Sequence, residues 1–180
     1  MRRATARVVF AFPIQLRPGP APMPFQVFLS HSYKDQETVA AIHDQLVASG
    51  INVWTSEQHP EPGRQLSDKI LEAIRQSDAL VVLLTETSSV SQYVQQEIGA
   101  ALLAKKSVLP LATFDVPPER LGMLAGIEYV RIDLDNPSTG VAVLSGSLQK
   151  RRDSKQQQEL AIALMLVGLL LLMALSAQSD

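Results

Sequence analysis

The stretch ALVVLLT, residues 79–85, is the strongest strand candidate in the chain. Its apolar side chains follow one another without alternation, and this pattern predicts that the strand is buried on both faces. Strands of this kind belong to parallel sheets that helices cover on both sides. We therefore predict that this segment is a central strand of an α/β domain.

Strand patterns recur on both sides of this segment. The four other strand candidates are FQVFLS at 25–30, INVW at 51–54, SVLPLAT at 107–113 and EYVRID at 128–133.

Helical patterns separate these strands. Apolar residues recur at helical spacing from Val39 to Val47, from Leu66 to Ile74 and over 93–105, and a last helix is expected over 137–152. Asp35 is expected to cap the first of these helices and Gly50 to end it. The alternation predicts a flavodoxin-like fold, with a five-stranded parallel sheet, helices on both faces and ligands beyond the carboxyl ends of the strands.

The composition excludes several classes of protein. The 180 residues suffice for one domain of ordinary size, and the net charge of −2 argues against a nucleic-acid partner. Without cysteine there is no disulfide, thiolate metal site or cysteine nucleophile. The three histidines, His31, His43 and His59, fit no local metal motif, and no P-loop, GxGxxG or GxSxG sequence occurs. We expect no metal site.

The carboxyl-terminal part of the chain has the composition of a membrane span. Residues 160–179 carry no charged side chain, and as a helix they would extend about 30 Å, one hydrocarbon thickness. The preceding basic sequence KRRDSK, residues 150–155, places the domain in the cytoplasm by the positive-inside rule. We predict a basic juxtamembrane linker over 151–159 and a single-pass transmembrane helix over 160–177. A buried core helix or an oligomerisation helix is the alternative.

Residues 1–24 differ from the rest of the chain. They hold four arginines, several prolines and no acidic residue, and they show no periodicity. Their apolar run VVFAF is too short for a signal peptide. We predict that the segment is disordered or reflects a misassigned start, with Met23 as the natural one, and that the domain occupies residues 25–150.

Glu97 is the candidate for chemistry. On a helix it shares a face with Tyr93 and lies at the border of the buried stripe. Its neighbours one turn later are Ala100 and Ala101, so no local lysine or arginine neutralises it and the small side chains leave space. A semi-buried carboxylate beside an aromatic ring suits the stabilisation of a developing positive charge, such as an oxocarbenium ion. The alternative is an ordinary solvated helix glutamate.

Two sequence boxes carry a family resemblance. The first is VFLSHS at 27–32, and the second is the SDA-strand-serine segment that continues through Tyr93 to Glu97. With the HPEPG loop, in this order and spacing, they resemble a bacterial-type Toll/interleukin-1 receptor (TIR) domain over residues 25–150. TIR domains are flavodoxin-like, and they either assemble as signalling scaffolds or cleave NAD⁺ at the nicotinamide N-glycosidic bond.

The resemblance also implies roles for particular residues. In catalytic members the essential acid is the glutamate of a Trp-x-x-x-Glu stretch, a position that Glu97 matches, with Tyr93 in place of the tryptophan. Ser30, His31 and Trp54 are expected to border the substrate. Trp54 as plain core and Ser30 as a turn residue remain alternatives.

We accordingly predict a membrane-anchored NAD⁺ glycohydrolase that releases nicotinamide and forms ADP-ribose or a cyclic ADP-ribose. NAD⁺ is the substrate, and no cofactor is expected. The resemblance further suggests an antiphage defence effector that self-associates through its TIR domains or answers to a separate sensor protein. A non-catalytic TIR adaptor and a virulence protein that interferes with host signalling are the alternatives.

Overall fold

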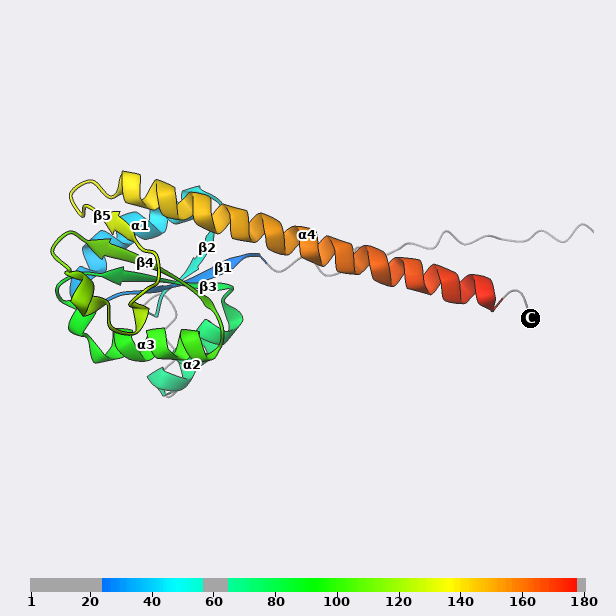
Figure 1. Ribbon diagram of the computed structural model, residues 1–180, viewed down its shortest axis with the longest axis horizontal. Helices are drawn as coiled ribbons and strands as arrows, with labels where there is room; N and C mark the ends of the chain where they lie inside the picture. Colours follow the sequence, from blue (N-terminus) through cyan, green and yellow to red (C-terminus); the bar gives the residue numbers. More distant parts are fainter. Residues whose placement is uncertain (1–23, 57–64, 178–180) are drawn as a thin grey trace, which may run out of the picture.

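The sheet has five parallel strands in the order β2-β1-β3-β4-β5. The computed structural model describes residues 24–56 and 65–177 (Figure 1). The strands are β1 (Gln26–Ser30), β2 (Asn52–Trp54), β3 (Ala79–Leu84), β4 (Ser107–Thr113) and β5 (Val130–Ile132). The flavodoxin-like prediction is confirmed, including the position of β3 between β1 and β4. The predicted segment 1–24 lies outside the described residues except at its last position.

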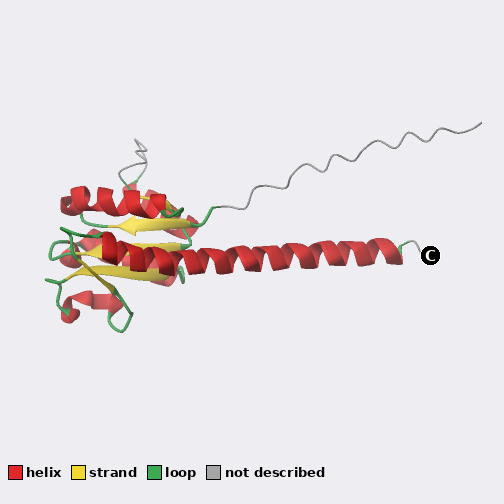
Figure 2. Cartoon of the chain, turned by 90° about the horizontal axis from the view of Figure 1, so that it is seen from above, coloured by secondary structure: helices red, strands yellow, loops and turns green. Residues whose placement is uncertain are grey.

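Helices cover both faces of this sheet. On one face lie α1 (Gln36–Ala48) and the first part of α4 (Ser138–Ser176), and on the other lie α2 (Leu66–Gln76) and α3 (Gln92–Leu103). Three short 3₁₀ helices, Tyr33–Asp35, Ser88–Val90 and Pro118–Leu124, fill the connections. Figure 2 shows the helices in layers around the strands.

The core is divided in two by β3, whose six residues are all buried. Ala79, Val81 and Leu83 pack with α1 and α4, whereas Leu80, Val82 and Leu84 pack with α2 and α3. Successive side chains of a strand point to opposite faces, so a strand buried on both sides needs an unbroken apolar run. This is the physical origin of the sequence ALVVLL.

Two details of the helix ends differ from expectation. Asp35 is the residue before α1, but its side chain makes no capping hydrogen bond. Its Oδ2 instead accepts a hydrogen bond of 3.0 Å from Thr85 Oγ1, which draws the carboxylate toward the loop after β3. The third helix ends at Leu103 and not at Lys105, because Lys105 has a left-handed backbone with φ of 55°.

The last helix, α4, is one continuous element of 39 residues. Only its first part is buried, at Gly140, Val141, Leu144, Ser145 and Leu148, and the remainder projects away from the domain (Figures 1 and 2). The expected linker over 151–159 is helical, since that stretch contains no glycine or proline and is rich in good helix formers. The projecting part is long and apolar enough to cross a membrane, with a mean hydropathy of 2.4 over its most apolar window.

Candidate active site

Glu97 lies inside the domain, close to the end of β1. It is only 8% exposed, and the Oγ atom of Ser30 donates a hydrogen bond to its Oε2. Ser30 is the last residue of β1 and pairs with Val82 of β3, so the strand alternation turns its side chain toward α3. A buried carboxylate is costly unless it is hydrogen-bonded, and this hydroxyl offsets part of that cost. Glu97 is therefore a fixed, buried acid.

A pocket of about 190 Å³ lies between α2 and α3, and Glu97 is one of the residues that line it. Its described lining residues are Ser67, Ile70, Leu71, Tyr93, Gln96, Glu97 and Ala100. Among these residues Glu97 alone is charged, and most of the wall is apolar. Ala100 leaves the space that the sequence predicted, whereas Ala101 is fully buried in the core. The pocket can hold a flat ring against a single carboxylate.

Tyr93 borders this pocket, one helical turn before Glu97. Its side chain is 67% exposed, so its ring is available to stack on a ligand at the pocket mouth. His31 is half-buried and lies next to Ser30, with Nδ1 3.3 Å from the backbone oxygen of Leu29. His31 thus follows the strand that carries Ser30 but is not one of the described residues lining the pocket.

Trp54 packs on the same face of the sheet as the pocket. Its ring stacks on Phe28, with centroids 4.9 Å apart and an interplanar angle of 29°. It belongs to the hydrophobic cluster that also contains Ile70 and Ala100 of the pocket wall. Trp54 therefore supports the pocket region, and its half-buried ring retains an exposed part.

Lys69 is a residue that the sequence analysis missed. It is 6% exposed, its Nζ donates a hydrogen bond of 2.7 Å to the backbone oxygen of Ser56, and the same Nζ lies 5.5 Å from the centroid of the Trp54 ring. Such a geometry is a cation–π contact in a partly dry environment. Lys69 lies next to the buried Ile70 and one helical turn before the buried Ala73 and Ile74. This spacing places the lysine on the buried face of α2, so the sequence pattern could have revealed it.

A larger hollow near the other edge of the sheet lacks such chemistry. It measures about 890 Å³ and lies between β4, β5 and the start of α4, with walls that include Val108, Pro110, Tyr129 and Val143. Its described charged lining residues are Glu128 and Arg151, and both are exposed. Size alone would favour this hollow, but the smaller pocket is lined by the buried Glu97 and is the better candidate. In the described ranges, no group of three His, Asp or Glu is placed to hold a metal ion.

Helices cover both faces of the parallel sheet, and the buried Glu97 lies near the carboxyl end of β1. These features define a flavodoxin-like α/β domain. The model of the TIR domain family matches residues 27–142. The chain belongs to the TIR domain family, as its two sequence boxes suggested.

Known relatives share this domain at low identity. A protein of Brachypodium distachyon, "Probable 2′ cyclic ADP-D-ribose synthase BdTIR", is 24% identical over 99 residues, which cover 54% of this chain and 44% of that protein. The chain thus matches less than half the length of this relative. The TIR domain of the Toll-related receptor TRR-2 from Hydra magnipapillata superposes with a TM-score of 0.58 at 18% identity, over 68% of this chain and 97% of that one. The latter similarity shows the shared fold.

Proposed function

We propose that this protein is a membrane-anchored NAD⁺-cleaving enzyme in which Glu97 is the catalytic acid residue. The observation that carries the proposal is the buried Glu97, whose carboxylate is held by Ser30 and which lines a pocket together with Tyr93. The name of the Brachypodium relative supports the same chemistry. In this proposal NAD⁺ is the substrate and no cofactor takes part.

The size of the pocket suggests which part of the substrate it takes. Whole-ligand pockets usually measure about 300–1,000 Å³, and about 190 Å³ is available here. This volume suits the nicotinamide end, with the ring against Ile70 and Leu71 and the exposed Tyr93 stacking at the mouth. The remainder of the dinucleotide would lie outside, toward Trp54 and the end of β1, where His31 is found.

The bond that breaks joins nicotinamide to the ribose. Its electron pair returns to the pyridinium nitrogen, so nicotinamide leaves neutral and positive charge develops on the ribose ring. The carboxylate of Glu97 would stabilise this charge and accept hydrogen bonds from the ribose hydroxyls. Water addition to the oxocarbenium carbon, with loss of a proton, gives ADP-ribose. Attack by another nucleophilic group of the same molecule gives a cyclic product.

Ser30 is a positioning residue in this scheme. Its hydroxyl holds one carboxylate oxygen, Oε2, and so fixes the orientation of the other. Pre-set dipoles and charges of this kind cost no reorganisation when the reaction occurs.

The anchored chain also concentrates its domains in two dimensions, which favours the self-association expected of active TIR domains. In an antiphage defence role, clustering of the chains or a separate sensor protein would trigger NAD⁺ cleavage.

The deciding experiment measures nicotinamide release from NAD⁺ by the full chain reconstituted in vesicles. Glu97→Gln removes the charge but keeps the shape, and it is expected to abolish release while the circular dichroism spectrum stays unchanged. Glu119→Gln, an exposed carboxylate elsewhere, is the matched control and is expected to retain release. Equal release by Glu97→Gln and the unaltered chain would refute the role of Glu97. No release from the folded, densely packed chain would favour the adaptor function.

A further inference from the structure

Most of the described basic residues of the domain gather at one end. They lie at the amino edge of the sheet, where the helices end and the strands begin, and on the adjoining turn of α4. These residues are Arg75, Lys105, Lys106, Lys150, Arg151, Arg152 and Lys155. The acidic residues at the same level are Asp78, Glu128, Asp153 and Glu159, and Asp44 and Glu72 lie one turn farther in on α1 and α2. We call this surface the basic edge.

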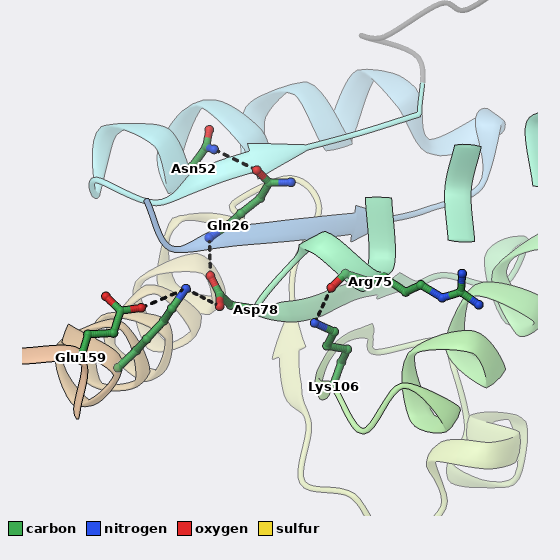
Figure 3. A network of polar contacts seen from close by, with 7 residues as sticks. Gln26, Asn52, Arg75, Asp78, Lys106 and Glu159 are labelled. Atoms are coloured by element: carbon green, nitrogen blue, oxygen red, sulfur yellow. Dashed lines mark hydrogen bonds and ion pairs between the residues drawn. The ribbon is translucent and has the colours of Figure 1, made fainter. Parts of the chain in front are cut away.

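Polar contacts connect the helix ends and the strand start that form the basic edge, and they hold these segments at the same height in the domain. Lys155 Nζ lies 2.7 Å from Asp78 Oδ1, and Asp78 Oδ2 accepts a hydrogen bond of 2.9 Å from the backbone nitrogen of Gln26 (Figure 3). Lys106 Nζ donates to the backbone oxygen of Arg75 at 2.6 Å, which joins the ends of α2 and α3 (Figure 3). The start of β3 is therefore level with residue 155 of α4.

This level lies close to the apolar part of α4. A helix rises about 1.5 Å per residue, so Lys155 is about 8 Å and Arg151 about 14 Å from Leu160, where the uncharged run begins. The headgroup layer on each side of a hydrocarbon core is about 5–8 Å thick. If the core begins at Leu160, Lys155 reaches the headgroups and the rest of the basic edge lies within about one Debye length of them.

The opposite edge of the domain has the opposite charge. The loops after the strands there carry Asp35, Glu86, Asp115, Asp133 and Asp135. The described basic residues near that edge are fewer, namely Lys34, Arg120, Arg131 and the buried Lys69. A domain with this asymmetry is attracted to a negative surface at one end and repelled at the other.

One side of α4 also offers a hollow that suits a phosphate. Its described lining residues are Lys150, Arg151, Ser154, Lys155 and Gln158, all of which can donate hydrogen bonds, and no carboxylate is among them. The pattern is typical of a surface that meets anionic headgroups.

We propose that the basic edge rests on anionic phospholipid headgroups, so that the membrane holds the domain upright with the Glu97 pocket facing away from it. This inference rests on the membrane anchoring in the proposed function and adds a second contact, between lipid and the folded domain itself. Each basic residue near such a surface contributes on the order of a fivefold preference for the docked orientation.

The test uses the absence of native cysteine in the chain. A fluorophore is attached to Ala48→Cys, at the exposed end of α1 near the basic edge, or to Ser138→Cys, at the far end of the domain. Quenching by headgroup-labelled lipid is measured for the full chain in phosphatidylcholine vesicles, with and without phosphatidylserine. Phosphatidylserine is expected to increase quenching at residue 48, and added salt to reverse the increase, with no change at residue 138.

Charge reversal identifies the surface. Lys105→Glu and Lys150→Glu are each expected to lower the phosphatidylserine-dependent quenching at residue 48 severalfold, whereas Lys34→Glu, with the same change in net charge at the other edge, leaves it unchanged. Equal quenching in both vesicle types would overturn the contact between the basic edge and lipid, but not the anchoring. An equal loss of quenching with Lys34→Glu would have the same meaning. Failure of the chain to float with either vesicle overturns the anchoring as well. Nicotinamide release from the same samples tests NAD⁺ cleavage separately.

Discussion

Ser30 and Glu97 are 67 positions apart in the chain, yet the hydroxyl of the first donates a hydrogen bond to the carboxylate of the second inside the domain. The contact joins the end of β1 to the middle of α3, the two segments that carry the sequence boxes of the family. It therefore links the fold directly to the proposed chemistry.

Replacement of Ser30 by alanine removes this donor from a buried carboxylate. A lost hydrogen bond to a buried charged group costs about 1–3 kcal/mol. We expect a lower free energy of unfolding of that order, together with a fall in kcat of about tenfold or more for nicotinamide release and little change in KM. Ser147→Ala removes a hydroxyl whose hydrogen bond, within the described part of the chain, goes to Val143 of its own helix, and it serves as the control. An unchanged kcat in Ser30→Ala would contradict the positioning role.

Tyr93 is expected to act through its ring. Tyr93→Ala removes the stacking surface at the pocket mouth and is predicted to raise KM for NAD⁺ severalfold, since an aromatic pair contributes about 0.5–1.5 kcal/mol. Tyr93→Trp keeps an aromatic ring and should retain or improve KM. Tyr33→Ala truncates another exposed tyrosine, which does not line the pocket, and should have no effect. Steady-state kinetics distinguish these outcomes, and a normal KM in Tyr93→Ala would remove the tyrosine from the site.

Ala100 sets the free volume of the pocket. Ala100→Phe places a ring into a space of about 190 Å³ and is expected to abolish nicotinamide release. The side chain is only half-buried, so the fold should tolerate the larger residue. Ala142→Phe adds the same bulk on an exposed turn of α4 and should keep full release. Retained activity in folded Ala100→Phe would place the substrate elsewhere, and the hollow near Tyr129 would be the next candidate.

Lys69 supports Trp54 from α2. Lys69→Met keeps the apolar stem but removes the ammonium, so the Ser56 carbonyl loses its donor and the cation–π contact disappears. We expect a loss of about 1–3 kcal/mol in the free energy of unfolding. Trp54 is the single tryptophan of the chain, so its fluorescence should also change on this substitution. Lys34→Met, at an exposed position, is the control, and identical fluorescence and stability in the two variants would argue against the contact.

The bond between Asp78 and Lys155 fixes α4 to the sheet. Asp78→Asn weakens this ion pair and is expected to lower the free energy of unfolding by about 1 kcal/mol, as is usual for a partly exposed pair. Proteolysis of α4 beyond residue 152 should become faster in this variant. Asp153→Asn removes a carboxylate whose ion pair among the described residues is with the adjacent Arg152, and it should change neither quantity. Equal protease resistance of Asp78→Asn and the unaltered chain would contradict the bracing role.

The sequence could predict the fold because burial leaves a direct record in residue type. The apolar run of β3 reports two covered faces, and the spacing around Glu97 reports the border of a buried helix face. No periodicity records the Ser30–Glu97 hydrogen bond, since it depends on how two distant elements pack. Lys69 was recognisable from its place on the apolar face of α2, but its partners, Ser56 and Trp54, lie on another segment.

The boundary placed at residue 151 shows a different limit. The basic sequence that starts there, and the change to an apolar composition at residue 160, suggested a linker followed by a separate helix. Helix propensity is indifferent to that change, because lysine, arginine and glutamine extend a helix as readily as leucine does. Composition therefore indicates which environment surrounds a segment, whereas backbone continuity follows from the absence of residues that break a helix.

The unbroken course of α4 has a geometric consequence for any bilayer that accepts its apolar part. A rod without a hinge holds every copy of the domain at one height above the membrane and leaves rotation about the helix axis and sliding in the plane as the main freedoms between neighbours. Two domains then find one another by diffusion in the membrane plane and rotation about one axis, instead of by diffusion in three dimensions and rotation in all directions. The surfaces that face sideways at that height, α1 and α2 among them, become the ones through which neighbouring copies first touch.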